Sequence, residues 1–103
     1  MDMAEANELH EQIQRANDRI STNMHTTQGV KHLRDDVIAK RVTGFVLHID
    51  ETAIVINATG KHASVKRLNG LFDAVISDCK DAIAKDCAKI TWCSEQLTAM
   101  LDN

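Results

Sequence analysis

The last third of the chain carries the pattern that most limits what it can fold into. Within residues 64–102, which contain no proline, apolar side chains recur at intervals of seven: Ile76, Ile83, Ile90 and Leu97. This spacing predicts a helix that packs along its whole length. About 39 helical residues would measure about 58 Å, whereas a compact domain of 103 residues is only about 33 Å across. We therefore expect a second copy of the chain to cover part of this stripe, with these four residues at the oligomer interface.

The first 41 residues predict two shorter helices. A single apolar stripe indicates the first, over about 3–24, and consists of Leu9, Ile13, Ala16, Ile20 and Met24. Ser, Thr, Asn and Gly gather in 21–29, which predicts a break there, with Thr26 or Thr27 capping the next helix. Val30, Leu33 and Val37 then indicate a second helix over about 28–41.

Residues 42–59 change in character, because half of them are Val, Ile or Thr. Such density favours β-strands and predicts a hairpin that turns at Asp50–Thr52, with a buried helix as the alternative. One face would carry Phe45, Leu47, Ile49, Ile54 and Ile56, and the other Val46, His48, Val55 and Asn57. A long helix capped by Ser64 follows, in which Asn69-Gly70 could introduce a kink. The expected fold is mainly α with a small β-hairpin (helix–helix–hairpin–long C-terminal helix), in a single domain over 1–103 that oligomerises through the last helix, the hairpin or both.

The chain has few cysteines and histidines, the residues that could form disulfides or bind metal ions, and their spacing matches no known site. Three cysteines, without a visible secretory signal or a long apolar stretch, indicate a reducing, cytoplasmic location with no membrane span. We expect the cysteines to be small buried hydrophobes, the alternative being a disulfide between two copies. The five histidines form no i,i+4 pair. We expect neither a metal nor a cofactor.

A basic middle lies between two acidic ends, because residues 31–67 contain seven basic and four acidic side chains. The start of the last helix falls in this stretch, and helix N-termini bind anions. A phosphorylated small ligand is therefore one candidate there, held by Thr59, Gly60, Lys61, Lys66 and Arg67; an ordinary strand–helix turn is the other reading.

A second basic patch, Lys31, Arg34, Lys40 and Arg41, would be doubled in a dimer. Duplex binding needs a basic surface, and the chain has a net charge of −3 with a pI near 5.9. Nucleic acid is therefore an unlikely partner.

No catalytic arrangement is visible in the sequence. Adjacent carboxylates such as Asp35 and Asp36 point about 100° apart on a helix and cannot share a proton. His48, placed beside Asn57 on the hairpin, is the one histidine that could lie in a half-buried polar pocket; a satisfied core histidine is the other reading. We therefore expect a small non-enzymatic interaction protein (an inhibitor, adaptor or sequestering protein) that acts as a homo-oligomer on a protein partner. The alternatives are an oligomeric binder of a phosphorylated ligand such as a nucleotide and, more weakly, a dimeric nucleic-acid-binding protein.

Overall fold

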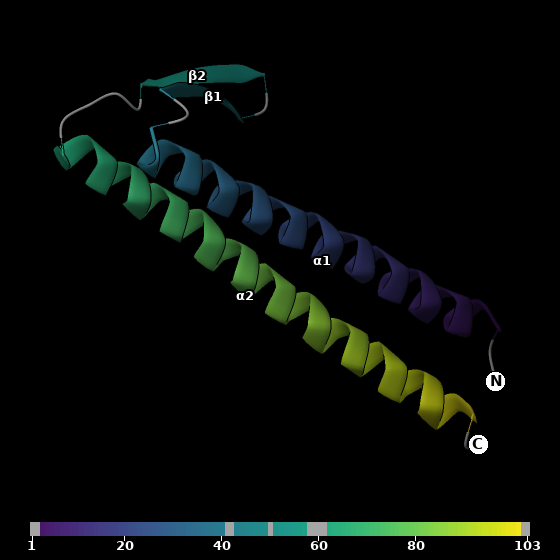
Figure 1. Ribbon diagram of the computed structural model, residues 1–103. Coiled ribbons are helices and arrows are strands. Elements are labelled where there is room, and N and C mark those ends of the chain that lie inside the picture. Colours follow the sequence, from purple (N-terminus) through teal and green to yellow (C-terminus); the bar gives the residue numbers. More distant parts are fainter. Residues whose placement is uncertain (1–2, 41–42, 50, 58–61, 102–103) are drawn as a thin grey trace. The chain divides into compact units, whose positions relative to one another are not determined.

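Two long helices are joined by a β-hairpin (Figure 1). The computed structural model describes residues 3–40, 43–49, 51–57 and 62–101, and only the backbone of residues 47, 49 and 62–66. The elements, in chain order, are α1 Met3–Ile38, β1 Gly44–Ile49, β2 Thr52–Asn57 and α2 His62–Leu101. The expected class, mainly α with a small hairpin before a long last helix, is confirmed.

The predicted break in the first helix is wrong, because α1 continues from Met3 to Ile38 without interruption. Polar side chains that could have capped a new helix bond back to carbonyl oxygens one turn earlier. The hydroxyl of Thr22 donates to the Asp18 oxygen and that of Thr26 to the Thr22 oxygen, while the Asn23 amide donates to the Arg19 oxygen. Side chains that bond in this way can occupy positions in the middle of a helix, so none of the three interrupts α1.

Packing explains why the helix persists through a stretch of weak helix formers. Ile20, Asn23, Thr27 and Val30 follow one another at steps of three, four and three residues, and all four are half-buried. The inward stripe thus continues through 21–29, although two of its members are polar. Tertiary packing routinely overrides intrinsic helix propensity, which differs by only about 0.7 kcal/mol among ordinary residues.

The end of α1 also differs from the expectation that it would reach Arg41. The helix ends at Ile38, and Lys40 follows in the left-handed region, with φ of 59°. The Ala39 amide donates to the Asp35 oxygen and the Lys40 amide to the Val37 oxygen. These two bonds satisfy carbonyl groups of the last turn, as in common helix C-terminal motifs.

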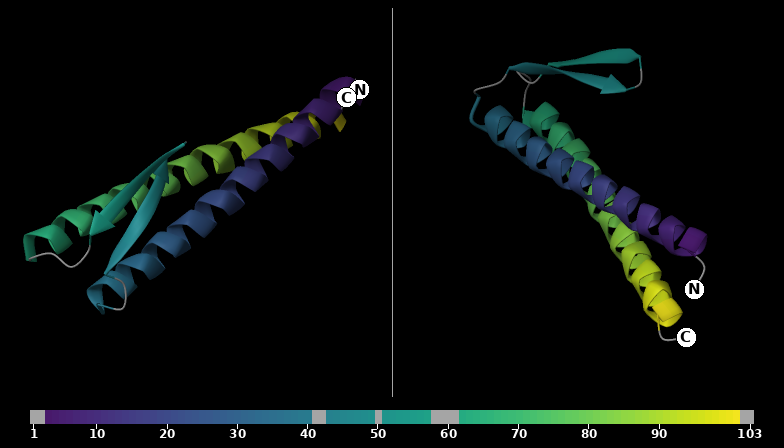
Figure 2. Two further views of the ribbon diagram at one scale, coloured as in Figure 1. Left: turned by 90° about the horizontal axis from the view of Figure 1, so that it is seen from above. Right: turned by 90° about the vertical axis from the view of Figure 1, so that its right-hand side faces the viewer.

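The Cα positions divide the chain into two compact units. Unit 1 comprises residues 3–26 of α1 and 78–101 of α2, and unit 2 comprises residues 27–77. Within unit 1 the two helix segments lie side by side and run in opposite directions, as the views in Figures 1 and 2 agree. Each long helix contributes to both units.

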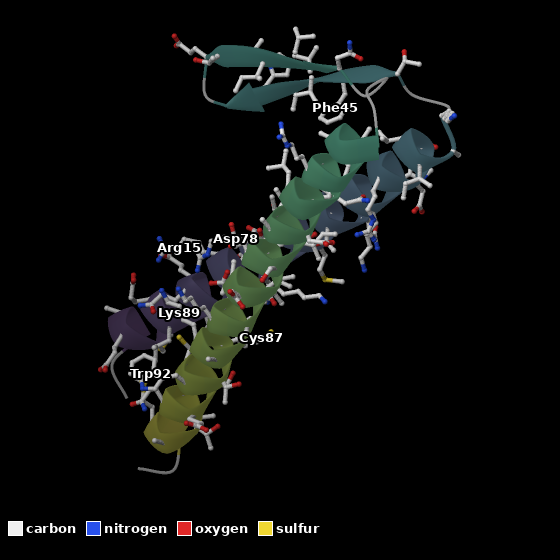
Figure 3. All side chains as sticks on the ribbon, turned by 90° about the vertical axis from the view of Figure 1, so that its left-hand side faces the viewer. Arg15, Phe45, Asp78, Cys87, Lys89 and Trp92 are labelled. Atoms are coloured by element: carbon white, nitrogen blue, oxygen red, sulfur yellow. The ribbon has the colours of Figure 1, made fainter. Side chains whose placement is uncertain are left out.

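The core of unit 2 joins the hairpin to both helices. Val37, Leu68 and Phe72 are buried, and Val30, Leu33, Phe45 and Ile56 pack against them. The ring of Phe45 meets that of Phe72 at a centroid distance of 5.9 Å and an angle of 36°, a tilted geometry that aromatic pairs favour. Figure 3 shows Phe45 directed from the hairpin toward the helices.

The hairpin forms with the expected faces, so the buried-helix alternative for 42–59 is excluded over the described residues. Its strands are antiparallel, and Phe45 is opposite Ile56, Val46 opposite Val55, and Ile49 opposite Thr52. Residues directly opposite share a face of the sheet. Thr52, expected in the turn, instead begins β2.

The last helix begins at His62, so Ser64 lies inside it and cannot be its N-cap residue. It then continues through Asn69 and Gly70 as one element to Leu101. The sequence pattern therefore predicts the existence and far end of this helix better than its first turn.

Phe72→Ala should lower the free energy of unfolding by about 3–5 kcal/mol, because it removes a buried ring and leaves a cavity. Phe72 is only 4 % exposed, whereas its neighbour Leu71 is 40 % exposed. Leu71→Ala is therefore the matched control and should cost less than about 1 kcal/mol. Urea unfolding followed by circular dichroism at fixed protein concentration measures both, and equal losses would contradict this assignment of the core.

Candidate functional site

The helix pair of unit 1 has a regular contact line, which we call the unit 1 seam. Its members are spaced alternately by three and four residues, and each is buried or half-buried. On α1 they are Ala6, Leu9, Ile13, Ala16, Ile20 and Asn23; on α2 they are Cys79, Ile83, Asp86, Ile90, Cys93, Leu97 and Met100. This is the seven-residue repeat of helices that pack with a small crossing angle.

Two contacts across the seam define its register. The guanidinium of Arg19 donates to the Asp86 carboxylate, with Nη2 at 2.9 Å from Oδ1 and Nε at 3.1 Å. Two turns away, Cys93 Sγ lies 3.8 Å from Gln12 Oε1. From one contact to the other, α1 moves back by seven residues while α2 moves forward by seven, as an antiparallel pair requires.

Among the described residues of unit 1, the ion pair between Arg19 and Asp86 is the one salt bridge that joins α1 to α2. The hydrogen bond to the carboxylate raises the pKa of Arg19 above its ordinary value, and the charge attraction acts in the same direction. The side chain of Asp86 is only 13 % exposed, while that of Arg19 is 48 % exposed. The Asp86 carboxylate therefore lies within the unit 1 seam, and the Arg19 guanidinium contacts it from a more exposed position.

The seam is incompletely covered within one chain. Cys93 is fully buried, yet Ile83, Ile90 and Leu97 are only half-buried although the α1 segment packs beside them. Further apolar side chains of unit 1 are exposed: Trp92 at 53 % and Leu101 at 71 %. The remaining residue of the expected oligomer interface, Ile76, belongs to unit 2 and is buried there, at 8 % exposure.

The residues of the expected anion site fall mostly outside what the structure describes. Thr59, Gly60 and Lys61 are outside the described residues, as is the side chain of Lys66, and Arg67 is exposed on α2. The binding of a phosphorylated ligand at these residues therefore stays a prediction.

The second basic patch is partly engaged by an ion pair. Arg34 Nη1 lies 2.9 Å from the Asp73 carboxylate, so its charge is matched within unit 2. Lys31 and Lys40 are exposed on α1 and just after it, and Arg41 is outside the described residues. Two exposed lysines are a small basic surface for a nucleic-acid duplex.

The candidate catalytic side chains lie apart from one another. His48 is exposed and lies opposite Ala53 rather than Asn57, so the expected half-buried pocket beside Asn57 is wrong. Cys79 and Cys93 are buried, as expected, whereas Cys87 is exposed. No three His, Cys, Asp or Glu side chains form a metal-binding group among the described residues.

Sequence reasoning missed two features of this arrangement. The inward stripe of α1 passes through Asn23 and Thr27, which as polar residues had indicated a break. Asp86 occupies an inward position between Ile83 and Ile90, and a charge at that point of the repeat was the available signal for a partner on the facing helix.

Comparisons with protein families, curated proteins and solved structures found no match. Any function must therefore be argued from this chain's own surfaces. Over the residues that the structure describes, neither helix includes an apolar stretch that could cross a membrane.

Asp86→Leu should raise the midpoint of thermal unfolding, because it extends the apolar seam. Replacing a buried ion pair by well-packed apolar groups is often stabilising, and removing one partner is costly only where the other charge is left buried; Arg19 is half exposed and keeps its contact with water. Asp81→Leu, at an exposed position of the same helix, is the control and should leave the midpoint almost unchanged. A fall for Asp86→Leu, measured by circular dichroism, would mean that the ion pair contributes more than apolar packing there.

Proposed function

We propose that the protein is a small non-enzymatic interaction protein that acts as a homo-oligomer on a protein partner, as an inhibitor, adaptor or sequestering protein. The observation that carries the proposal is the partial exposure of the unit 1 seam. Ile83, Ile90 and Leu97 repeat every seven residues on α2 and remain half-buried after α1 has packed against them.

The physics of helix packing supports an oligomer. Two helices shield only the sides of an apolar stripe that face each other, whereas four helices enclose a common core. Two copies of this chain could supply the four helices by self-association, and two-fold dimers are the commonest soluble oligomers. The half-buried isoleucines and leucine would then lie inside the bundle.

The exposed aromatic side chain supports a role in protein binding. Trp92 is 53 % exposed, and Figure 3 shows it on the same helix as Lys89 and Cys87. Tryptophan is enriched among the residues that contribute most to protein interfaces. A shallow surface nearby, formed by Ile90, Thr91, Ser94, Glu95, Thr98 and Ala99, adds mostly uncharged area next to it.

The positions of the titratable groups support a non-enzymatic role. A nucleophile and its base must lie within hydrogen-bond reach of each other. Cys79 and Cys93 are instead buried, while His10, His25 and His48 lie exposed on three different stretches of the chain.

Trp92→Glu tests this proposal, because it places a charge on the proposed binding surface without removing a buried side chain. We expect reduced self-association in light scattering behind size exclusion, or loss of a partner that the wild-type chain captures by crosslinking, with helix content unchanged. Ala88→Glu, one turn away and also exposed, is the matched control. A wild-type chain that is monomeric at all concentrations would contradict the proposal, and so would a Trp92→Glu chain that is indistinguishable from the wild type in both assays.

A further inference from the structure

The strands of the hairpin are unusual in having no charged residue and no proline. β1 reads GFVLHI and β2 reads TAIVIN. Natural sheets protect their edges against pairing with other chains by placing charges, especially lysine, or proline on edge strands. This hairpin has neither device in its strands, although both strands are edge strands.

The face turned away from the core is apolar and open. Phe45 and Ile56 pack against the core of unit 2, so their opposite-face neighbours, Val46 and Val55, point away from it. These two valines lie directly opposite each other and are 49 % and 79 % exposed. Ile54, which shares the other face with Phe45 and Ile56, is also 42 % exposed near the turn.

The backbone of β2 provides a template for another strand. In an antiparallel ladder with two residues in the connection, the pair that flanks the connection exchanges both hydrogen bonds, and the pairing then alternates. Ile49 and Thr52 form that flanking pair. The amide and carbonyl groups of Ala53 and Val55 are therefore directed outward, and over the described residues the sheet contains only β1 and β2.

We propose that β2 pairs antiparallel with β2 of a second copy of this chain and so forms a four-stranded sheet across a two-fold axis. This inference rests on the proposed homo-oligomer and names one of its interfaces. Two strands need further strands or packing against a helix for stability, and the helix core of unit 2 covers only the face with Phe45 and Ile56. Pairing through β2 would also place four valines, two from each copy, in one row.

The charge pattern favours a second copy over a different partner. A two-fold interface brings residues at its axis next to their own counterparts and pairs every other residue with a residue of the same strand, so charges in the strand are readily brought against like charges. The uncharged strand TAIVIN avoids this repulsion throughout. The β2 edge is preferred over the β1 edge because Val55 is far more exposed than Val46.

Val55→Lys is the first test, measured by sedimentation equilibrium of the full chain. A lysine on the pairing edge should weaken self-association by about ten-fold or more, while circular dichroism and the unfolding midpoint report that the fold persists. Val55→Thr keeps a β-branched side chain and should associate like the wild type. An oligomeric wild type whose association is unchanged by Val55→Lys would overturn the β2 interface and leave the proposed function standing; a monomeric wild type would overturn both.

A disulfide test decides the matter even if Val55→Lys disturbs the hairpin. In a Cys87→Ser background, which removes the exposed thiol, Val55→Cys should form a crosslinked dimer on mild oxidation, because the register with four valines in one row places the two copies of residue 55 directly opposite each other. Val46→Cys is the matched control from the same cross-strand pair, because its two copies would be about three strand spacings, or ~14 Å, apart. Crosslinking by Val46→Cys alone, or by none of the variants in an oligomeric protein, would overturn the proposal.

Discussion

Neither long helix can shield its apolar stripe from water by itself, and the arrangement of the chain follows from that constraint. In unit 1 the stripe of α2 is shielded partly by α1, along a seam whose register is defined by Arg19 with Asp86 and by Gln12 with Cys93. In unit 2 the hairpin adds a third surface, so Phe72 is buried against Phe45. The shielding is nearly complete around Phe72 and incomplete around Ile90.

The two units differ in how completely their apolar side chains are buried. Unit 2 contains an apolar cluster of helix and hairpin side chains with three buried residues at its centre. Its exposed hydrophobic side chains include the valines of the outer hairpin face, while Trp92 and Leu101 are exposed in unit 1. These two surfaces, one on the hairpin and one on α2, are the ones that we propose as binding surfaces.

Much of this architecture could be predicted from the sequence, because period and composition report directly on burial. The seven-residue repeat predicted α2, and the density of branched residues predicted both strands and their faces. The continuity of α1 through Asn23 and Thr27 could not be predicted, since it depends on tertiary packing that overrides local preference. The partner of Asp86 was equally hidden, because Arg19 lies 67 positions earlier and no local rule connects the two. The anion site was predicted from basic side chains at the N-terminus of the last helix, and Thr59–Lys61 lie outside the described residues.

We propose that apolar surface left open in one chain is covered by another copy of the same chain. Native mass spectrometry of the gently purified full chain tests it most directly, because it reports the number of subunits and any retained molecule together. The account predicts an even oligomer whose mass is a clean multiple of 11.4 kDa. A monomer that persists as the protein concentration is raised would contradict it.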